Sequence, residues 1–216
     1  KEKMKLAYPF LPKLLEIILQ KVPARGGFQS VRGALGFLAN MVKLTYQKND
    51  LITAAHASLL DRETDYRLAD LDPSGDLINR AKMNLEELQN NPLALEVASA
   101  TLLYTMTESG RMRGITKEDL IKNVLNPHTD INDMEKTLLS FQKYASHFWI
   151  QEGRFYFDLE EKPDAKVEFH ALSVSEQQAK EYLFQLWRED VFKENINCVI
   201  YAGVEETKTA LEELET

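Results

Sequence analysis

The run Phe148-Trp149-Ile150-Gln151-Glu152-Gly153-Arg154-Phe155-Tyr156-Phe157 decides how the second half of this 216-residue chain folds. Two stretches rich in aromatic residues flank a short polar turn that contains a glycine. This pattern predicts a β-hairpin, because aromatic and β-branched residues favour strands and glycine favours tight turns. We expect these aromatic side chains to pack within the protein rather than to stack on nucleic-acid bases.

Three helices are predicted before this hairpin. The first covers Leu93 to Thr107, the second runs from Thr116 to Leu125, and the third begins near Asn132, with Glu135 completing a capping-box-like start. Thr116 is a suitable N-cap, because its hydroxyl can accept a hydrogen bond from a free N–H of the first turn. Helix, short helix, helix and hairpin is the element order of a winged helix. We therefore predict a winged-helix-like domain over residues 92–170, with the hairpin as its wing.

Residues 1–91 are predicted to form a separate helical domain that ends at Asn90-Asn91-Pro92. Pro12 suits the first position of a helix, where its missing N–H is harmless. Ser30 is a plausible N-cap for a second helix, and residues 61–76 are polar with turn signals. The apolar face expected for the second helix consists of Ala34, Leu35, Leu38, Met41, Val42, Thr45 and Tyr46.

Residues 171–216 are predicted to hold a helix and the start of a truncated α/β domain. Pro163-Asp164 begins a connector, Ser175 to Glu194 has helical spacing, and Asn197 to Ala202 reads as a buried strand. The residues after Gly203 look helical and offer that strand no partner. Since the chain also starts at Lys1 rather than at Met, we expect it to be a piece of a longer protein. The overall prediction is a mainly α protein with a small amount of β structure.

Composition indicates a cytoplasmic protein of one or two domains. The chain is 44% hydrophobic and 28% charged, and its single cysteine, Cys198, excludes an internal disulfide framework. No secretory signal or apolar stretch of membrane-spanning length is visible. Residues 1–50 carry nine Lys and Arg against three Asp and Glu, although the formal net charge of the whole chain is -8. This basic segment either faces phosphate groups or includes a solvated end at Lys1, Lys3 and Lys5.

The sequence contains no recognisable catalytic constellation. There is no Gly-x-x-x-x-Gly-Lys-Ser/Thr phosphate-binding loop and no Gly-x-Ser-x-Gly nucleophile elbow. The four histidines are far apart and form no i, i+4 pair; they are His56, His128, His147 and His170. We therefore expect no enzymatic activity, no metal site and no cofactor of the chain alone.

Four arginines are candidate binding residues. Arg32 would project from the first turn of an otherwise apolar helix, and its planar guanidinium suits phosphate. It is either a sensor of a bound nucleotide or a structural arginine paired with a carboxylate. Arg111, Arg113 and Arg154 could form a basic spot that contacts nucleic acid, or they could serve packing or a protein partner. Residues 116–158 carry five Lys and Arg against seven Asp and Glu, which argues against strong independent DNA binding.

The motifs of the first domain resemble a known family. Tyr8-Pro9-Phe10-x-Pro12, followed by Gly27-Phe28-Gln29-x-x-Arg32-Gly33-Ala34-Leu35-x-x-Leu38-Ala39, is similar to large bacterial AAA+-type ATPases of a domain-of-unknown-function family. This family includes the ATPase components of BREX-type anti-phage defence systems. The resemblance covers roughly residues 6–170, and Gly153-Arg154-Phe155-Tyr156-Phe157 also fits it. It implies a helical AAA+-like lid followed by a winged-helix-like region, with the Walker-type core absent from this chain.

The resemblance also implies a function. The chain would be a non-catalytic C-terminal portion of a large cytoplasmic ATPase, with Arg32 sensing ATP and Mg bound by the missing N-terminal core. Family members commonly have His at the position of Leu11 and a second Arg at that of Ser30. The other partners expected are proteins or further copies of the chain. The alternatives are a stand-alone winged-helix DNA-binding regulator and a purely structural interaction module.

Overall fold

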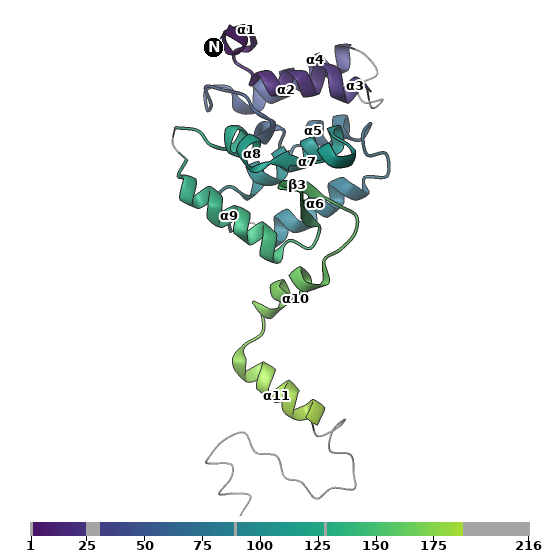
Figure 1. The fold of residues 1–216 in the computed structure, drawn as a ribbon, viewed down its shortest axis with the longest axis vertical. Coiled ribbons are helices and arrows are strands. Elements are labelled where there is room, and N and C mark those ends of the chain that lie inside the picture. Colours follow the sequence, from purple (N-terminus) through teal and green to yellow (C-terminus); the bar gives the residue numbers. More distant parts are fainter. Residues whose placement is uncertain (1, 25–30, 89, 128, 188–216) are drawn as a thin grey trace, which may run out of the picture. The chain divides into compact units, whose positions relative to one another are not determined.

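The structure is a computed structural model that describes residues 2–24, 31–88, 90–127 and 129–187 (Figure 1). These residues are mainly helical, as the sequence predicts, and they carry one small antiparallel sheet. The helices are α1 (Glu2–Ala7), α2 (Pro12–Glu16), α3 (Val22–Ala24), α4 (Val31–Thr45), α5 (Arg62–Leu68), α6 (Asp76–Glu87), α7 (Ala94–Thr107), α8 (Lys117–Val124), α9 (Ile131–Tyr144), α10 (Pro163–Ala171) and α11 (Glu176–Leu186). The strands and short helical turns are β1 (Ile115–Thr116), β2 (Phe148–Gln151), β3 (Arg154–Phe157), η1 (Ile17–Lys21), η2 (Ala54–His56) and η3 (Gly110–Met112).

The chain divides into two compact units, residues 1–169 and residues 170–216. The boundary expected at residues 91 and 92, between a lid and a winged helix, lies inside the first unit. The second unit begins at His170, beside the start expected for the C-terminal region at residue 171. No helix in the described parts of either unit is long and apolar enough to cross a membrane.

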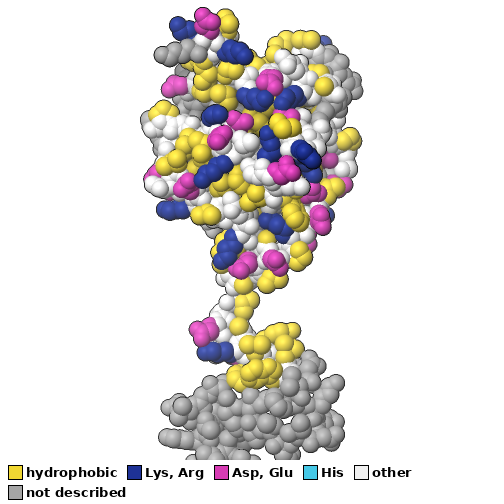
Figure 2. Space-filling model, viewed as in Figure 1, with side chains coloured by type: hydrophobic (Ala, Val, Ile, Leu, Met, Phe, Trp, Pro, Cys, Tyr) yellow, Lys and Arg dark blue, Asp and Glu magenta, His cyan; other side chains and the backbone are white. Residues whose placement is uncertain are grey.

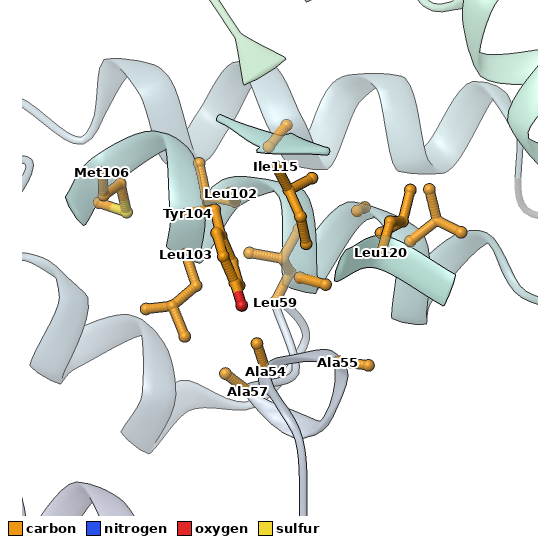
Figure 3. Close-up of a cluster of buried hydrophobic side chains, with 14 of the residues drawn as sticks. Ala54, Ala55, Ala57, Leu59, Leu102, Leu103, Tyr104, Met106, Ile115 and Leu120 are labelled. Carbon is orange, nitrogen blue, oxygen red and sulfur yellow. The ribbon is translucent and has the colours of Figure 1, made fainter. Parts of the chain in front are cut away.

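Helix α7 lies at the centre of the first unit (Figure 1). Every residue from Val97 to Thr107 is buried, so the helix has no solvent-facing side over three turns. It packs against η2 and α6 from the first half of the chain and against α8, β1 and β3 from the second half. Figure 3 shows its Leu103 and Tyr104 beside Ala54 and Ala57, whose small side chains allow the segments to approach closely. The two halves therefore share one core.

The predicted hairpin forms in the structure. Strand β2 pairs antiparallel with β3, with Phe148 opposite Phe157 and Gln151 opposite Arg154. Glu152 and Gly153 have φ angles of 50° and 73°, as a tight two-residue hairpin turn requires. Strand β1, which the sequence analysis missed, pairs with the other edge of β3 and gives the sheet the order β1-β3-β2.

The face of α4 that enters the core differs from the expected one. Phe37 is buried, whereas Leu35 and Tyr46, which were expected inside, are exposed. Tertiary packing decides which face is buried, because η1, η2 and α5 cover one side of α4. Leu139 of α9, a large apolar residue, is also exposed.

Local hydrogen bonds explain where several helices begin. The Thr116 hydroxyl accepts a hydrogen bond from the Asp119 N–H at 3.2 Å, which confirms the predicted N-cap of α8. Helix α9 begins at Ile131, beside the predicted start, but its N-cap is Asp130 rather than Asn132. The carboxylate of Asp130 accepts the Asn132 N–H at 2.9 Å. In the same way the carboxylate of Asp61 caps α5, within a segment expected to consist of turns. Pro12 takes the first position of α2, as predicted.

The second unit contains the end of α10 and the whole of α11. Helix α10 begins at Pro163, where only a connector was expected. Ser175 and Gln178 form a capping box at the start of α11, and no residue of α11 is buried. The predicted strand at 197–202 and the helix after it lie outside the described residues, as does the expected N-cap Ser30.

Candidate functional site

Arg32 lies in the first turn of α4, and its side chain is exposed. Within the described parts of the chain it makes no hydrogen bond or ion pair with another residue. Its guanidinium is therefore available to an anionic group supplied from elsewhere, since a planar fork of N–H donors suits phosphate or carboxylate oxygens. The position agrees with that expected from the sequence.

A second guanidinium, which the sequence analysis missed, lies along the same flank of α4. Arg67 of α5 is positioned over Gly36, where a Cβ atom would come within 2.7 Å of its Nη1. This Nη1 also donates a hydrogen bond to the carbonyl oxygen of Gly33 at 3.4 Å, and Nη2 lies 2.5 Å from Glu63. Gly36 and Arg32 are four residues apart and so share one side of the helix. In the sequence, only the pair Gly33 and Gly36 indicated that a side chain could approach the backbone of α4 so closely.

Arg113 is held within the protein by three contacts. Its Nη1 donates to Asp158 Oδ2 at 2.5 Å, and its Nη2 donates to the Phe157 carbonyl oxygen at 2.8 Å. Its guanidinium carbon lies 4.9 Å from the centre of the Tyr156 ring, within the range of a cation–π interaction. These contacts fasten the 110–114 turn to the end of β3, so Arg113 has a structural role.

Arg154 fastens the same turn from the other end of β3. Its Nη1 donates a hydrogen bond to the Gly114 carbonyl oxygen at 3.0 Å, and its Nη2 lies 3.6 Å from the Met112 sulfur. Gly114 has a φ of 83°, and a Cβ atom there would lie 2.2 Å from the Phe155 carbonyl oxygen. Glycine is required because only it combines this conformation with so close an approach.

A pocket of about 460 Å³ lies between this turn and the tip of the hairpin. It is lined by two arginines, a tyrosine, two further polar side chains and a glycine: Arg111, Arg113, Tyr156, Gln151, Glu152 and Gly110. Arg111 is exposed and is not paired with another described residue. Burial, followed by the charge of Asp158, raises the pKa of Tyr156, so this phenol remains a neutral hydrogen-bonding group at neutral pH. Two of the three predicted arginines, Arg111 and Arg113, thus line one pocket, and Arg154 contacts the same turn from β3. Arg113 and Arg154 are already engaged by groups of the protein.

The outer face of α9 carries charges that are paired. Glu135 forms an ion pair with Lys117 of α8 at 3.0 Å, and Lys143 forms one with Glu168 of α10 at 3.3 Å. Lys136 lies 3.9 Å from Asp133 on the same helix. Exposed pairs of this kind add little stability, but they lower the positive potential that would attract a phosphate backbone.

Two histidines in the described ranges, His56 and His147, have structural contacts. His56 accepts a hydrogen bond from the backbone N–H of Thr53 at 3.0 Å, and His147 is buried with its Nδ1 3.1 Å from the Asp158 carbonyl oxygen. Among these residues, no group of three His, Cys, Asp or Glu side chains is placed to hold a metal ion. His128 lies outside the described residues.

Lowering the pH is expected to destabilise the protein through His147. Burial, with the charge of Arg80 acting in the same direction, lowers its pKa against the effect of hydrogen bonds with the backbone of Asp158 and Glu160. Its Nε2 is buried without a partner in the described structure, so a second ring proton would find no acceptor. The unfolded chain therefore binds this proton more strongly, and the stabilisation is complete above the ordinary histidine pKa of about 6.5 and is lost as the pH falls below it through the lowered pKa of the folded state.

This expectation can be measured as the difference in melting temperature between wild type and His147→Gln at several pH values. The difference should become smaller as the pH falls, because only the wild type loses stability by protonation at this position. His170→Gln, at an exposed position in the second unit, provides the control and should leave the pH dependence as it is in wild type. A difference that stays constant between about pH 7 and pH 5 would contradict the assignment.

A buried polar network joins the first half of the chain to α8, and no sequence motif indicated it. The side-chain oxygen of Asn123 accepts the Ala54 N–H at 2.9 Å, and its amide nitrogen donates to the Asp119 carbonyl oxygen at 2.7 Å and to the Tyr104 hydroxyl at 3.4 Å. The Thr53 hydroxyl donates to the Asn123 carbonyl oxygen at 2.5 Å. Burial raises the pKa of Tyr104 to about 12. The side-chain oxygen and the backbone carbonyl oxygen of Asn123 thus both connect α8 to a segment about 70 residues away in sequence.

Comparisons with family models, with curated proteins and with solved structures found no match to this chain. Its function must therefore be inferred from the residues and geometry described above.

Proposed function

We propose that this chain is a non-catalytic coupling module of a large ATPase, in which a helical lid and a winged helix move as one body. Three features support the proposal: the free guanidinium of Arg32, the shared core around α7, and the strand order of the sheet. The first of these carries the functional conclusion, because an exposed arginine without a partner in the described structure can receive an anion from another domain.

The winged-helix assignment is supported by topology. The elements follow the order α7, β1, α8, α9, β2 and β3, and the sheet has the order β1-β3-β2. A winged helix has this succession of three helices and three strands, with the last two strands forming the wing. The function cannot be taken from the fold alone, since one fold serves many functions.

The charge distribution favours a coupling role over DNA binding. In a winged helix that binds DNA, the third helix often enters the major groove, and here that helix is α9. Its lysines are engaged with carboxylates, and Arg113 and Arg154 donate to groups within the protein. Figure 2 shows Lys and Arg side chains interspersed with Asp and Glu side chains over the face in view. Strong binding to a phosphate backbone requires many uncompensated cationic contacts.

The nucleotide would be bound mainly by another part of the assembly. Arg32 fits the role of a phosphate contact, because its guanidinium is exposed and its helix presents it from the first turn. The described residues of this chain offer no cluster of ligands for the accompanying metal ion. The role of Arg32 would be to stabilise negative charge on the terminal phosphate of the nucleotide. A displacement of α4 would reach α9 and the hairpin through α7, since both halves of the chain pack on that helix.

The test uses the natural protein that contains this chain together with an ATPase core. Arg32→Ala is expected to lower kcat for ATP hydrolysis by at least about tenfold, because it removes a charged hydrogen-bond donor to phosphate. Arg62→Ala is the matched control, since Arg62 is also an exposed arginine in the first turn of a helix, α5. Equal turnover and nucleotide affinity for wild type and Arg32→Ala would exclude the role.

A second measurement addresses the DNA-binding alternative. The chain itself is mixed with nonspecific duplex DNA in a gel-shift experiment at low salt. Under the coupling proposal no retardation is expected at micromolar protein. Retardation that fades with added salt and is lost in Arg111→Ala would favour a DNA-binding regulator instead, because phosphate contacts are salt-dependent.

A further inference from the structure

Helix α4 has a second apolar surface that the described residues leave largely uncovered. Val31 is 73% exposed, Leu35 is 58% exposed and Tyr46 is 68% exposed. Ala39 is exposed and Val42 half-buried between them. We call these five residues the α4 stripe. Their spacing of four, four, three and four residues places them on one side of a helix.

The stripe is continuous along the helix. The Tyr46 N–H donates to the Val42 carbonyl oxygen at 2.8 Å, so the helical path continues past Thr45 to include Tyr46. From Val31 to Tyr46 the stripe is therefore roughly 22 Å long. The apolar face that packs into the core lies beside the stripe and contains Ala34, Phe37, Leu38 and Met41, and Val42 of the stripe packs partly against this core. The helix thus has a wider apolar arc than its own unit covers.

A row of cationic groups borders the stripe. Arg32 and Lys43 are eleven residues apart, so they lie on the same side of α4, and Arg67 lies over Gly36 on this flank. Glu63 pairs with Arg67, and Asp61 interacts electrostatically with Lys43. Arg32 has no ion-pair partner among the described residues. The flank is therefore net positive beside an apolar surface.

We propose that the α4 stripe binds an amphipathic helix of a partner protein that has acidic side chains along one edge. Anchors at spacings of three and four residues are the recognition pattern of a helix that lies along an apolar surface. The apolar face of the partner would cover Leu35 and Val42, and its acidic edge would face Arg32 and Lys43. Charge complementarity of this kind selects partner and orientation more than it adds affinity.

A second copy of α4 fits this surface less well. In an antiparallel pair related by a two-fold axis, the same flank of each helix lies beside that of the other. Arg32 of one copy would then lie alongside Lys43 of the other, and like charges so placed repel. Arg32 could contact either a nucleotide phosphate or the acidic edge of the partner helix, so the test of this inference is built on Lys43 and Leu35 and leaves the ATPase measurement on Arg32 as a separate result.

The test uses two synthetic helical peptides of about 18 residues, matched in length to the stripe. Both carry leucines at the same spacings, and one edge is glutamate in the first peptide and lysine in the second. The glutamate peptide is expected to bind the chain about tenfold more tightly than the lysine peptide in fluorescence anisotropy. Leu35→Asp and Val31→Asp should each weaken binding at least about tenfold, because a carboxylate would be buried against leucine. Lys43→Glu should remove most of the preference for the glutamate peptide.

Leu139→Asp is the control, because Leu139 is an equally exposed leucine on a different amphipathic helix, α9. It should bind both peptides as wild type does. Failure to bind the glutamate peptide, equal affinity for both peptides, or unchanged binding by Leu35→Asp would each overturn the proposal. Sedimentation that shows a dimer of the chain, dissociated by Leu35→Asp and unaffected by the glutamate peptide, would assign the stripe to a second copy instead.

Discussion

Replacement of Phe148 by alanine is expected to lower the free energy of unfolding by about 4 kcal/mol, the usual cost of removing a fully buried phenyl ring. Phe148 is completely buried, and its ring centre lies 5.0 Å from that of Phe141, 5.7 Å from that of Phe155 and 5.5 Å from that of Phe157. Its removal would leave a cavity between α9 and the hairpin. Aromatic pairs at these distances add a further stabilising contribution to the burial of apolar area.

Urea denaturation followed by circular dichroism measures this effect. Phe148→Leu should lose less than about 2 kcal/mol, because the leucine fills much of the cavity. Ile150→Ala, at an exposed position of the same strand, should lose less than about 1 kcal/mol. An unfolding free energy of Phe148→Ala within about 1 kcal/mol of wild type would mean that the aromatic cluster does not hold the hairpin in place.

Replacement of Asn123 by alanine is expected to cost about 3 kcal/mol, because it leaves buried partners without hydrogen bonds. The Ala54 N–H and the Tyr104 hydroxyl would both lose contacts made by this side chain. The change should also loosen the attachment of η2 to α8, since Asn123 accepts the Ala54 N–H directly. If the chain couples its two halves as proposed, this loosening should reduce coupling as well as stability.

Hydrogen exchange provides the local measurement. The Ala54 amide should exchange faster in Asn123→Ala than in wild type, by a factor larger than that of amides in α9. Asn79→Ala is the control, since Asn79 is exposed on α6 and its loss should change stability by less than about 0.5 kcal/mol. Unchanged protection of Ala54 in Asn123→Ala would show that the side chain does not secure this connection.

Sequence reasoning predicted the features that depend on neighbouring residues. The hairpin depends on a short polar turn with glycine between two aromatic runs, and the Thr116 cap depends on a residue three positions away. Strand β1 could not be predicted, because two residues form a strand only where β3 offers an edge. The apolar face of α4 was misassigned at Leu35 for a similar reason: its periodicity fits two faces, and η1, η2 and α5 cover only one.

The candidate site was predicted less completely than the fold. Arg111, Arg113 and Arg154 were expected near one another, and the turn and the hairpin do bring them together. Their sequence spacing could not indicate that Arg113 and Arg154 donate to backbone carbonyl oxygens within the protein. Arg67 was missed altogether, because its contact with Gly33 joins residues that are 34 positions apart and lie in two different helices. The sensor role of Arg32 remains a prediction, which the ATPase measurement addresses.

The burial of α7 on all sides has a consequence for how this protein can diverge. Along α9, substitutions should be accepted at every third or fourth position, where the side chain faces solvent. From Val97 to Thr107 this periodic tolerance should be absent, because at each position a neighbouring group limits the size of the side chain. Related sequences should therefore keep small and apolar residues at these positions, whereas the sequences of α9 and α11 should vary more.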